Sequence, residues 1–285
     1  MTAPDASHPS NTIAFIGGGN MARSLIGGLI VRGTPASAIR VSEPVGELRE
    51  ALARDFGVSV FEDSTAAVRV AGVWLLAVKP QVMRAVCERL APLAQDRRPL
   101  VISIVAGIAA GQLARWLGAD EPGSAPAVVR CMPNTPALLG AGVTGLYANA
   151  RVDAADRRRA EHLLASAGQT VWVDDEALMD AVTGVSGSGP AYVFLLAEAM
   201  EHAARAEGLP EGAARILVQQ TLLGAARMLV ESGEAPAELR RRVTSPGGTT
   251  QAAIETFENG NFASLVAAAV HAATTRSAQL SAAND

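Results

Sequence analysis

Three consecutive glycines, placed directly after a short apolar run, constrain this chain more than any other feature. The run Ile13–Ile16 predicts a buried strand, and Gly17-Gly18-Gly19 ends it abruptly. An amphipathic helix is predicted next, because Met21, Leu25, Ile26 and Leu29 fall on one stripe. The spacing Gly17-x-Gly19-x-x-Ala22 is typical of a dinucleotide-binding turn: the first glycine permits the turn, the second admits a pyrophosphate, and the small third residue allows close packing.

A second predicted strand, Ile39–Ser42, ends at an acid. Glu43 follows Ala22 by about twenty residues, where a carboxylate accepts a hydrogen bond from a ribose 2′-OH and repels a 2′-phosphate. The pyrophosphate itself would lie on free N–H groups at the helix start. The alternative is a glycine-rich turn without a ligand. We assign cofactor binding here to Gly17, Gly18, Gly19, Asn20, Met21, Ala22, Ser42 and Glu43.

Composition limits the class of protein. The 285 residues are 49% hydrophobic and 18% charged, which is typical of a globular chain with room for two domains. The net charge of −4 favours neither nucleic acid nor an anionic membrane as a partner. The arginine clusters Arg157–Arg159 and Arg240–Arg242 are interpreted as solvated helix faces.

Location and metal content follow from what the sequence does not contain. No apolar run is long enough to cross a bilayer, and residues 1–11 form a short polar tail without the apolar segment of a signal peptide. Cys87 and Cys131 have no metal or redox spacing, so we expect no metal site and a cytoplasmic protein. The histidines His162, His202 and His271 lie in helical stretches, and catalysis is not expected to need an imidazole.

The order of the predicted elements indicates an α/β chain followed by an all-α region. Strands are expected at Ile13–Ile16, Ile39–Ser42, Val58–Phe61, Val73–Val78, Leu100–Ile104, Val128–Cys131, Val143–Tyr147 and Thr170–Val173, with helices such as Pro80–Leu93 between them. This alternation predicts a doubly wound, mostly parallel Rossmann sheet over residues 12–174. Residues 175–285 are expected to form an all-helical domain, with helices at Ala191–Glu207, Glu211–Glu231, Ala235–Val243, Thr249–Glu258 and Phe262–Ala282, three of them stopped by Gly208, Gly233 and Gly260. The role of this domain in substrate binding and dimerisation is implied by the family resemblance described below.

Lys79 is the single lysine among 24 basic residues. It follows the fourth predicted strand, at the sheet edge where ligands of such folds bind. A compact ammonium is not interchangeable with the arginine used elsewhere in the chain. Lys79 is therefore a candidate catalytic residue, and the alternative is a chance lysine on a surface turn.

The segment Thr244–Thr250 combines a Pro-Gly-Gly turn with a helix start. Its free N–H groups and hydroxyls suit a carboxylate ligand, and simple helix capping by Ser and Thr is the alternative. A third stretch, Gly184–Tyr192, is rich in small residues and leads into a long helix; we interpret it as close packing between domains, and a ligand contact is the alternative.

Five motifs together resemble pyrroline-5-carboxylate reductase, in the family's order and across nearly the whole chain. They are Phe15–Ala22, Ala77–Gln81, Arg130–Pro136, Ser186–Tyr192 and Thr244–Thr250. The resemblance implies a Rossmann domain, a helical domain that forms a homodimer and is compatible with a larger ring of dimers, and reduction of 1-pyrroline-5-carboxylate to L-proline by NADPH or NADH.

The resemblance also implies roles for individual residues. Substrate would bind at Ser245, Gly247, Gly248, Thr249 and Thr250, with Thr250 at the ring nitrogen, and cofactor contacts would extend to Ala77, Val78, Lys79, Pro80 and Asn134. Some relatives have an Asn-Arg pair suited to a 2′-phosphate where this chain has Glu43-Pro44.

Two other functions remain open at this point. A β-hydroxyacid dehydrogenase would have a proton-transferring lysine four residues after a motif like Gly184–Gly189, where this chain has Val193. A non-enzymatic nucleotide sensor would keep Gly17–Ala22 without needing Ser245–Thr250.

Overall fold

The computed structural model describes residues 11–119 and 124–283. The chain divides into two compact units. One contains the chain up to Gly187 together with the segment from Ala273 onwards, and the other is Ser188–Ala272. The predicted functional division at residue 174 is a different boundary and stays a prediction.

The first half of the first unit is a regular alternation of strands and helices. Its elements are β1 (Ile13–Ile16), α1 (Asn20–Val31), the 3-10 helix η1 (Ala36–Ala38), β2 (Ile39–Ser42), α2 (Gly46–Phe56), β3 (Ser59–Phe61), α3 (Ser64–Val68), β4 (Val73–Leu76) and α4 (Pro80–Arg97). The short helix α3 begins where the Asp63 side chain accepts a hydrogen bond from the Thr65 backbone N–H. Pro80 occupies the first turn of α4, as the sequence predicts.

The second half continues the sheet and then becomes helical. It contains β5 (Leu100–Ser103), α5 (Ala110–Trp116), β6 (Ala127–Met132), the 3-10 helix η2 (Thr135–Leu139), β7 (Gly142–Ala148), α6 (Ala154–Leu164), η3 (Ala165–Ala167), β8 (Gly168–Trp172), α7 (Leu178–Val182) and the π-helical turn η4 (Thr183–Gly187). The small-residue stretch around Gly184, which leads into a long helix, is itself helical over Thr183–Gly187.

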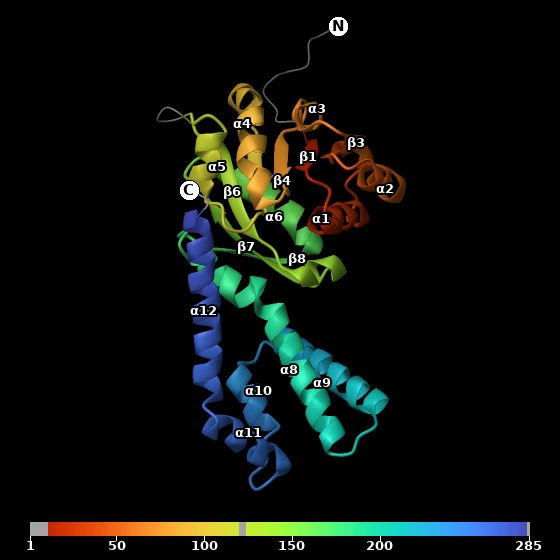
Figure 1. Ribbon diagram of the computed structural model, residues 1–285, viewed down its shortest axis with the longest axis vertical. Helices are drawn as coiled ribbons and strands as arrows, with labels where there is room; N and C mark the ends of the chain where they lie inside the picture. The colour runs from red at the N-terminus through yellow and green to blue at the C-terminus, as the bar shows by residue number, and fades with distance from the viewer. Residues whose placement is uncertain (1–10, 120–123, 284–285) are drawn as a thin grey trace. The chain divides into compact units, whose positions relative to one another are not determined.

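Within the described residues, eight strands form one sheet in the order β3-β2-β1-β4-β5-β6-β7-β8 (Figure 1). The β6–β7 pair is antiparallel, and every other neighbouring pair is parallel. This is the doubly wound, mostly parallel sheet that the alternating pattern predicts. In such a sheet β1 and β4 lie side by side where the strand order reverses, which is where ligands bind.

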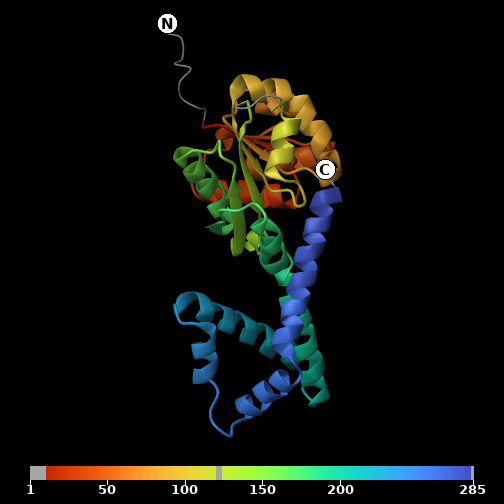
Figure 2. The same cartoon turned by 90° about the vertical axis from the view of Figure 1, so that its left-hand side faces the viewer.

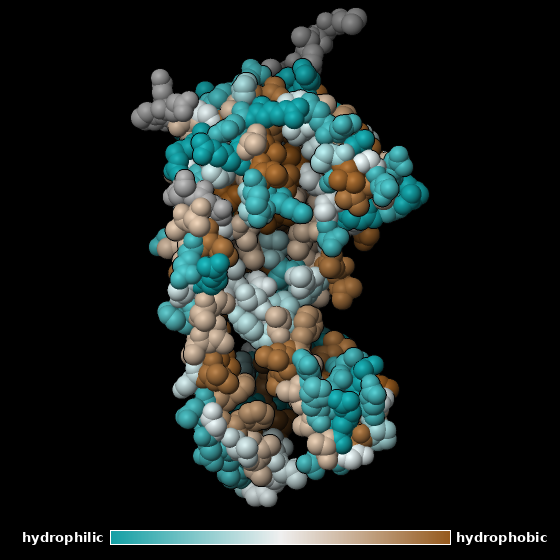
Figure 3. Space-filling model, in the orientation of Figure 1, coloured by the Kyte–Doolittle hydropathy of each residue, from teal (hydrophilic) through white to brown (hydrophobic). Residues whose placement is uncertain are grey.

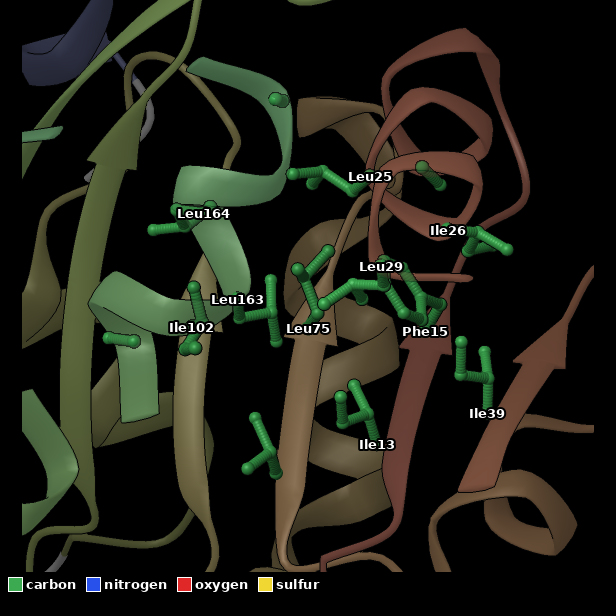
Figure 4. Packing of buried hydrophobic residues seen from close by; sticks show 14 of the residues in the cluster. Ile13, Phe15, Leu25, Ile26, Leu29, Ile39, Leu75, Ile102, Leu163 and Leu164 are labelled. Atoms are coloured by element: carbon green, nitrogen blue, oxygen red, sulfur yellow. The ribbon is translucent and has the colours of Figure 1, made fainter. Parts of the chain in front are cut away.

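Both faces of the sheet are covered by helices, which explains why the central strands β1, β4 and β5 are buried along their whole length. Alternate residues of β1 point to opposite faces: Phe15 packs with α1, and Ile16 packs with α4. Figure 4 shows the first of these cores, where Leu25, Ile26 and Leu29 of α1 lie over the strands. The helix α6 adds Leu163 and Leu164 to the same face.

The second unit is entirely helical in its described residues. It contains α8 (Gly189–Ala206), α9 (Glu211–Glu231), α10 (Pro236–Arg242), α11 (Thr249–Asn259) and the first half of α12 (Phe262–Ala283), whose remainder belongs to the first unit (Figure 2). Left-handed Gly208 ends α8 and Gly233 follows α9, as predicted. After α11 the left-handed residue is Asn261 rather than Gly260.

Few side chains are buried within this unit. Brown, apolar surface is visible over its helices (Figure 3). The buried apolar residues are Ala214, Val218 and Leu239. None of the described helices is both long enough and apolar enough to traverse a lipid bilayer.

Candidate active site

The glycine turn is fixed between the ends of two strands. Gly17 has φ +101°, and a Cβ placed there would lie 2.7 Å from the carbonyl oxygen of Ala77. Its N–H donates to the Ser42 carbonyl oxygen at 2.9 Å. No residue except glycine meets both conditions, because the backbone is left-handed and a neighbouring carbonyl fills the space. The turn therefore has a defined position at the carboxyl edge of the sheet.

The carboxylate of Glu43 braces the same turn from β2. One oxygen accepts from the Gly18 N–H at 2.9 Å, and the other accepts from the Val45 N–H at 3.0 Å. Glu43 is only 7% exposed. Its charge is thus held beside the turn by backbone donors. A ribose contact from Glu43, predicted from the sequence, would add to this structural role and stays a prediction.

Gly19 faces open space, in contrast to Gly17 and Gly18. A Cβ added at Gly19 would meet no atom within 4 Å, and Gly19 is exposed. It precedes α1 without a side-chain cap, and the first helical bond runs from Arg23 N–H to the Gly19 carbonyl. The N–H groups of the first turn, Asn20 to Ala22, are therefore free to bind an anion. The cradle fits the pyrophosphate of a dinucleotide, which a side chain at Gly19 would displace.

The segment after β4 lies against this turn. The Ala77 N–H donates to the Ile16 carbonyl at 2.8 Å. The strand β4 ends at Leu76, two residues before the predicted end. Lys79 is exposed at the start of α4, and no residue in the described ranges pairs with its ammonium. The Ser42 hydroxyl, also assigned to the cofactor, is buried against the Phe15 carbonyl at 3.5 Å.

The Asn134 side chain forms two hydrogen bonds that connect neighbouring segments. Its side-chain amide donates to the Ser186 carbonyl at 3.1 Å and accepts from the Val143 N–H at 2.9 Å. Asn134 is buried and ties the end of β6 to β7 and to η4. The amide has a second N–H beyond these two bonds, and the predicted cofactor contact of Asn134 stays a prediction.

In the second unit, the turn before α11 has the form that the sequence predicts. Gly247 is left-handed at φ +70°, and the Gly248 N–H donates to the Ser245 carbonyl at 3.0 Å. A Cβ at Gly248 would lie 2.7 Å from the Ser245 hydroxyl oxygen, so this glycine is required by close packing. The turn delivers the chain directly into α11 at Thr249.

The start of α11 is not capped by a side chain. The N-cap residue is Gly248, and neither Ser245 nor a threonine hydroxyl accepts from the first helical N–H groups. Helix capping by Ser and Thr side chains, the alternative interpretation of this segment, is therefore not observed. The N–H groups of Thr249 and Thr250 remain available to an anion. The half-buried Thr250 side chain has no hydrogen-bond partner among the described residues.

The predicted site residues thus fall into two sets. The first unit brings together the glycine turn, Ser42, Glu43 and the Ala77–Pro80 segment. The second unit contains the Ser245–Thr250 turn. The role of each residue toward cofactor or substrate stays a prediction.

The described residues contain no cluster of three or more His, Cys, Asp or Glu side chains placed to hold a metal. Both cysteines are buried; burial raises the pKa of the Cys87 thiol to about 12 and raises the pKa of Cys131 as well. Neither is a thiolate at neutral pH. His202 and His271 are exposed on helices of the second unit.

The first unit also contains a partly buried ionic cluster that the sequence pattern does not predict. The Arg130 guanidinium lies 3.1 Å from the Glu176 carboxylate and 4.0 Å from that of Asp180. Glu176 also accepts from the Ala110 N–H, and the Ser277 hydroxyl donates to Asp180 at 2.7 Å. The cluster attaches the end of α12 to the sheet. An arginine inside the apolar strand Ala127–Met132 was the available signal.

Similarity to known proteins identifies the family. The chain is 54% identical over 268 residues to the pyrroline-5-carboxylate reductase of Pseudomonas aeruginosa, covering 94% of this chain and 96% of the relative. This chain belongs to the pyrroline-5-carboxylate reductase family. Residues 176–280 of the reductase match the family model described as pyrroline-5-carboxylate reductase dimerisation, and residues 12–107 match that described as NADP oxidoreductase coenzyme F420-dependent.

Solved structures of the family have the same fold as this reductase. The pyrroline-5-carboxylate reductase of Coxiella burnetii superposes with a TM-score of 0.91 at 40% identity, covering 96% of this chain and 99% of the other. The Plasmodium falciparum pyrroline carboxylate reductase, solved with NADP bound, has a TM-score of 0.81 at 27% identity and covers 96% and 100%. The Rossmann and helical parts of the reductase are therefore both family features.

Proposed function

We propose that this reductase converts 1-pyrroline-5-carboxylate to L-proline, with NADPH or NADH as the reductant. The observation that carries the proposal is the 54% identity to the Pseudomonas aeruginosa enzyme over nearly both whole chains. The open glycine turn and the uncapped start of α11 support it, because one suits a dinucleotide and the other a carboxylate.

The first unit holds the reductant. The nicotinamide cofactor, when bound, supplies the hydride that reduces the imine carbon. The N–H groups of Asn20, Met21 and Ala22 bind its pyrophosphate, while Glu43 meets the adenosine ribose. Lys79 stands at the same edge of the sheet, where its ammonium attracts the negatively charged parts of the ligands.

The second unit holds the substrate. The free N–H groups of Thr249 and Thr250 and the hydroxyl of Ser245 bind the substrate carboxylate, and the positive end of the α11 dipole adds to its binding. Thr250 offers its hydroxyl to the ring nitrogen. A cyclic imine is basic at nitrogen and accepts hydride readily once protonated, so orientation supplies most of the catalysis and no imidazole is required.

The reductase is a homo-oligomer that acts on a small molecule. We place its dimer interface on the C-terminal helices, with the functional domains divided near residue 174, and a ring of dimers as the larger particle. The dimerisation match over residues 176–280 supports this assignment. A cytoplasmic location is supported by two free, buried thiols and is tested by cell fractionation.

The decisive experiment is a turnover assay on the purified enzyme. Loss of NADPH or NADH absorbance is followed with 1-pyrroline-5-carboxylate and, separately, with a 3-oxo acid. We expect turnover with the imine alone and L-proline as the product. Turnover of the keto acid would support a β-hydroxyacid dehydrogenase, and cofactor binding without turnover of either would support a nucleotide sensor. Either result would overturn the proposal.

A further inference from the structure

A guanidinium is fixed directly beyond the end of β2, next to the carboxylate that is expected to meet the adenosine ribose. Arg49 lies in the first turn of α2, and its Nη1 donates to the carbonyl oxygens of Glu43 at 2.7 Å and Pro44 at 3.1 Å. Both N–H groups of Nη1 are therefore used, and two bonds to consecutive carbonyls hold the planar group in a defined orientation. The cation is thus placed beside the glycine turn that Glu43 braces.

The other two nitrogens of Arg49 are not used by the protein. Nε and Nη2 form no hydrogen bond with any residue in the described ranges. The side chain is 23% exposed, and neither nitrogen is a buried atom without a partner, so both reach the solvent. Nε and Nη2 lie on one edge of the guanidinium, the pair of donors that binds two oxygens of a phosphate at once. Arg49 therefore presents an oriented fork of donors to the solvent.

Neighbouring charges leave this fork available. The nearby acid is Glu62, the residue after β3, whose carboxylate lies 3.6 Å from Arg49 Nη2. This distance is too long for a hydrogen bond, and because Glu62 is 78% exposed the pair is weak. Arg40, on β2 itself, donates from Nε and Nη2 to backbone carbonyls of α3 and lies over the Phe61 ring. Arg49 is accordingly the cation that can receive an anion beside Glu43.

We propose that Arg49 binds the 2′-phosphate of NADPH and thereby determines that this enzyme uses that cofactor. The inference rests on the proposed function, which places the adenosine ribose at Glu43. A phosphate on the ribose 2′-oxygen is an anion beside a carboxylate, and Arg49 offsets that repulsion through Nε and Nη2. With NADH, Glu43 accepts from the free 2′-hydroxyl instead. Arg49 supplies from α2 the cation that some relatives have directly after β2, so one site serves both cofactors.

The test is calorimetric titration of the purified enzyme with NADP⁺ and, separately, with NAD⁺, in the absence of substrate. The two dinucleotides differ only in the 2′-phosphate, so the ratio of their dissociation constants isolates that group. Arg49→Gln should weaken NADP⁺ binding roughly tenfold, the effect of losing a charge-assisted contact, and leave NAD⁺ binding unchanged. Arg49→Lys keeps the charge without the fork and should have an intermediate NADP⁺ affinity.

A matched control and the NAD⁺ titration distinguish this role from support of the loop. Arg54→Gln removes a 72%-exposed arginine from the same helix and should leave both affinities unchanged. Equal weakening of NADP⁺ and NAD⁺ binding in Arg49→Gln would show that Arg49 only supports the loop and would overturn the inference, as would an unaltered NADP⁺ affinity. If the wild-type enzyme bound neither dinucleotide, the proposed function would fail together with the inference.

Discussion

The two compact units of this enzyme differ in how far their apolar side chains are buried. In the first unit, helices cover both faces of the sheet, and side chains such as Phe15, Leu75 and Trp74 are fully buried. In the second unit Phe194, Ile216 and Leu265 are each about two-thirds exposed, at 67%, 68% and 67%. Both units have hydrophobic residues in regular helical or strand patterns, but only the first encloses them within one chain.

This difference in burial indicates that the helical unit forms an interface. Exposed apolar area on this scale is unfavourable in water and marks a surface that another molecule covers. Because the dimerisation match spans residues 176–280, the covering molecule is a second copy. The stability of the second unit is then inseparable from association, whereas the first unit has its own core.

The largest expected effect comes from charging the exposed helical face. Leu265→Glu places a carboxylate where a partner helix should pack, which costs several kcal/mol if the site is buried on association. We expect the particle to dissociate and lose activity, as seen by analytical ultracentrifugation. Val31→Glu, at a position 88% exposed in the first unit, is the matched control and should remain assembled. An intact, active Leu265→Glu oligomer would contradict the assignment of α12 to the interface.

Substitutions in the glycine turn separate folding from ligand binding within the first unit. Gly17→Ala meets the Ala77 carbonyl at a left-handed position and should lower the free energy of unfolding by about 2 kcal/mol or more. The Cβ added by Gly19→Ala contacts no protein atom, so the variant should have the wild-type melting temperature. It should bind NADPH more weakly, because the methyl group occupies the space predicted for the pyrophosphate. Melting curves and cofactor fluorescence give the two readouts. An NADPH affinity in Gly19→Ala equal to that of the wild type would contradict pyrophosphate binding at this turn.

Thr250→Ala tests the substrate role of the second unit. Losing one hydroxyl that pairs with a buried polar group costs on the order of 1–3 kcal/mol, so kcat/KM should fall roughly ten- to a hundredfold while NADPH affinity is kept. Thr256→Ala is the control on the same helix, because its hydroxyl is already bonded to the Ala252 carbonyl. Similar steady-state constants for the two variants would mean that Thr250 does not meet the substrate.

Lys79→Ala tests whether the single lysine contributes to catalysis. It is exposed at the start of α4, so its removal should leave the melting temperature unchanged. We expect kcat/KM to fall roughly tenfold, the effect of about 1.4 kcal/mol in transition-state stabilisation. Arg84→Ala, at an exposed position of the same helix, should leave it unaltered. Full activity in Lys79→Ala would exclude a catalytic role.

The smallest effect is expected for cofactor choice. Glu43→Ala would leave the N–H groups of Gly18 and Val45 unpaired, whereas Glu43→Gln removes the charge and keeps one of the two acceptors, so it is the milder change. The ratio of kcat/KM for NADPH to that for NADH should rise severalfold, because repulsion of the 2′-phosphate is lost. An unchanged ratio in a variant with wild-type stability would show that Glu43 only supports the turn.

The order of elements and the fold class could be predicted from sequence because periodicity reports burial directly. The strands Ile13–Ile16 and Ile39–Ser42 and the helix Glu211–Glu231 have the predicted bounds. The fourth strand was predicted too long, since Ala77 and Val78 are apolar but follow the end of the ladder. Propensity could not indicate the π turn Thr183–Gly187, because small residues there suit both a loop and a helix.

By itself the sequence determined the glycine turn, the acid after β2 and the helix start at Thr249, because each depends on neighbours along the chain. Tertiary structure decided which polar groups are already paired. It gave Glu43 two backbone donors, paired the buried Arg130 with the partly exposed Glu176, and left one nitrogen of Arg159 without a partner. These outcomes depend on segments far apart in sequence that meet only in the fold, so no local pattern contains them.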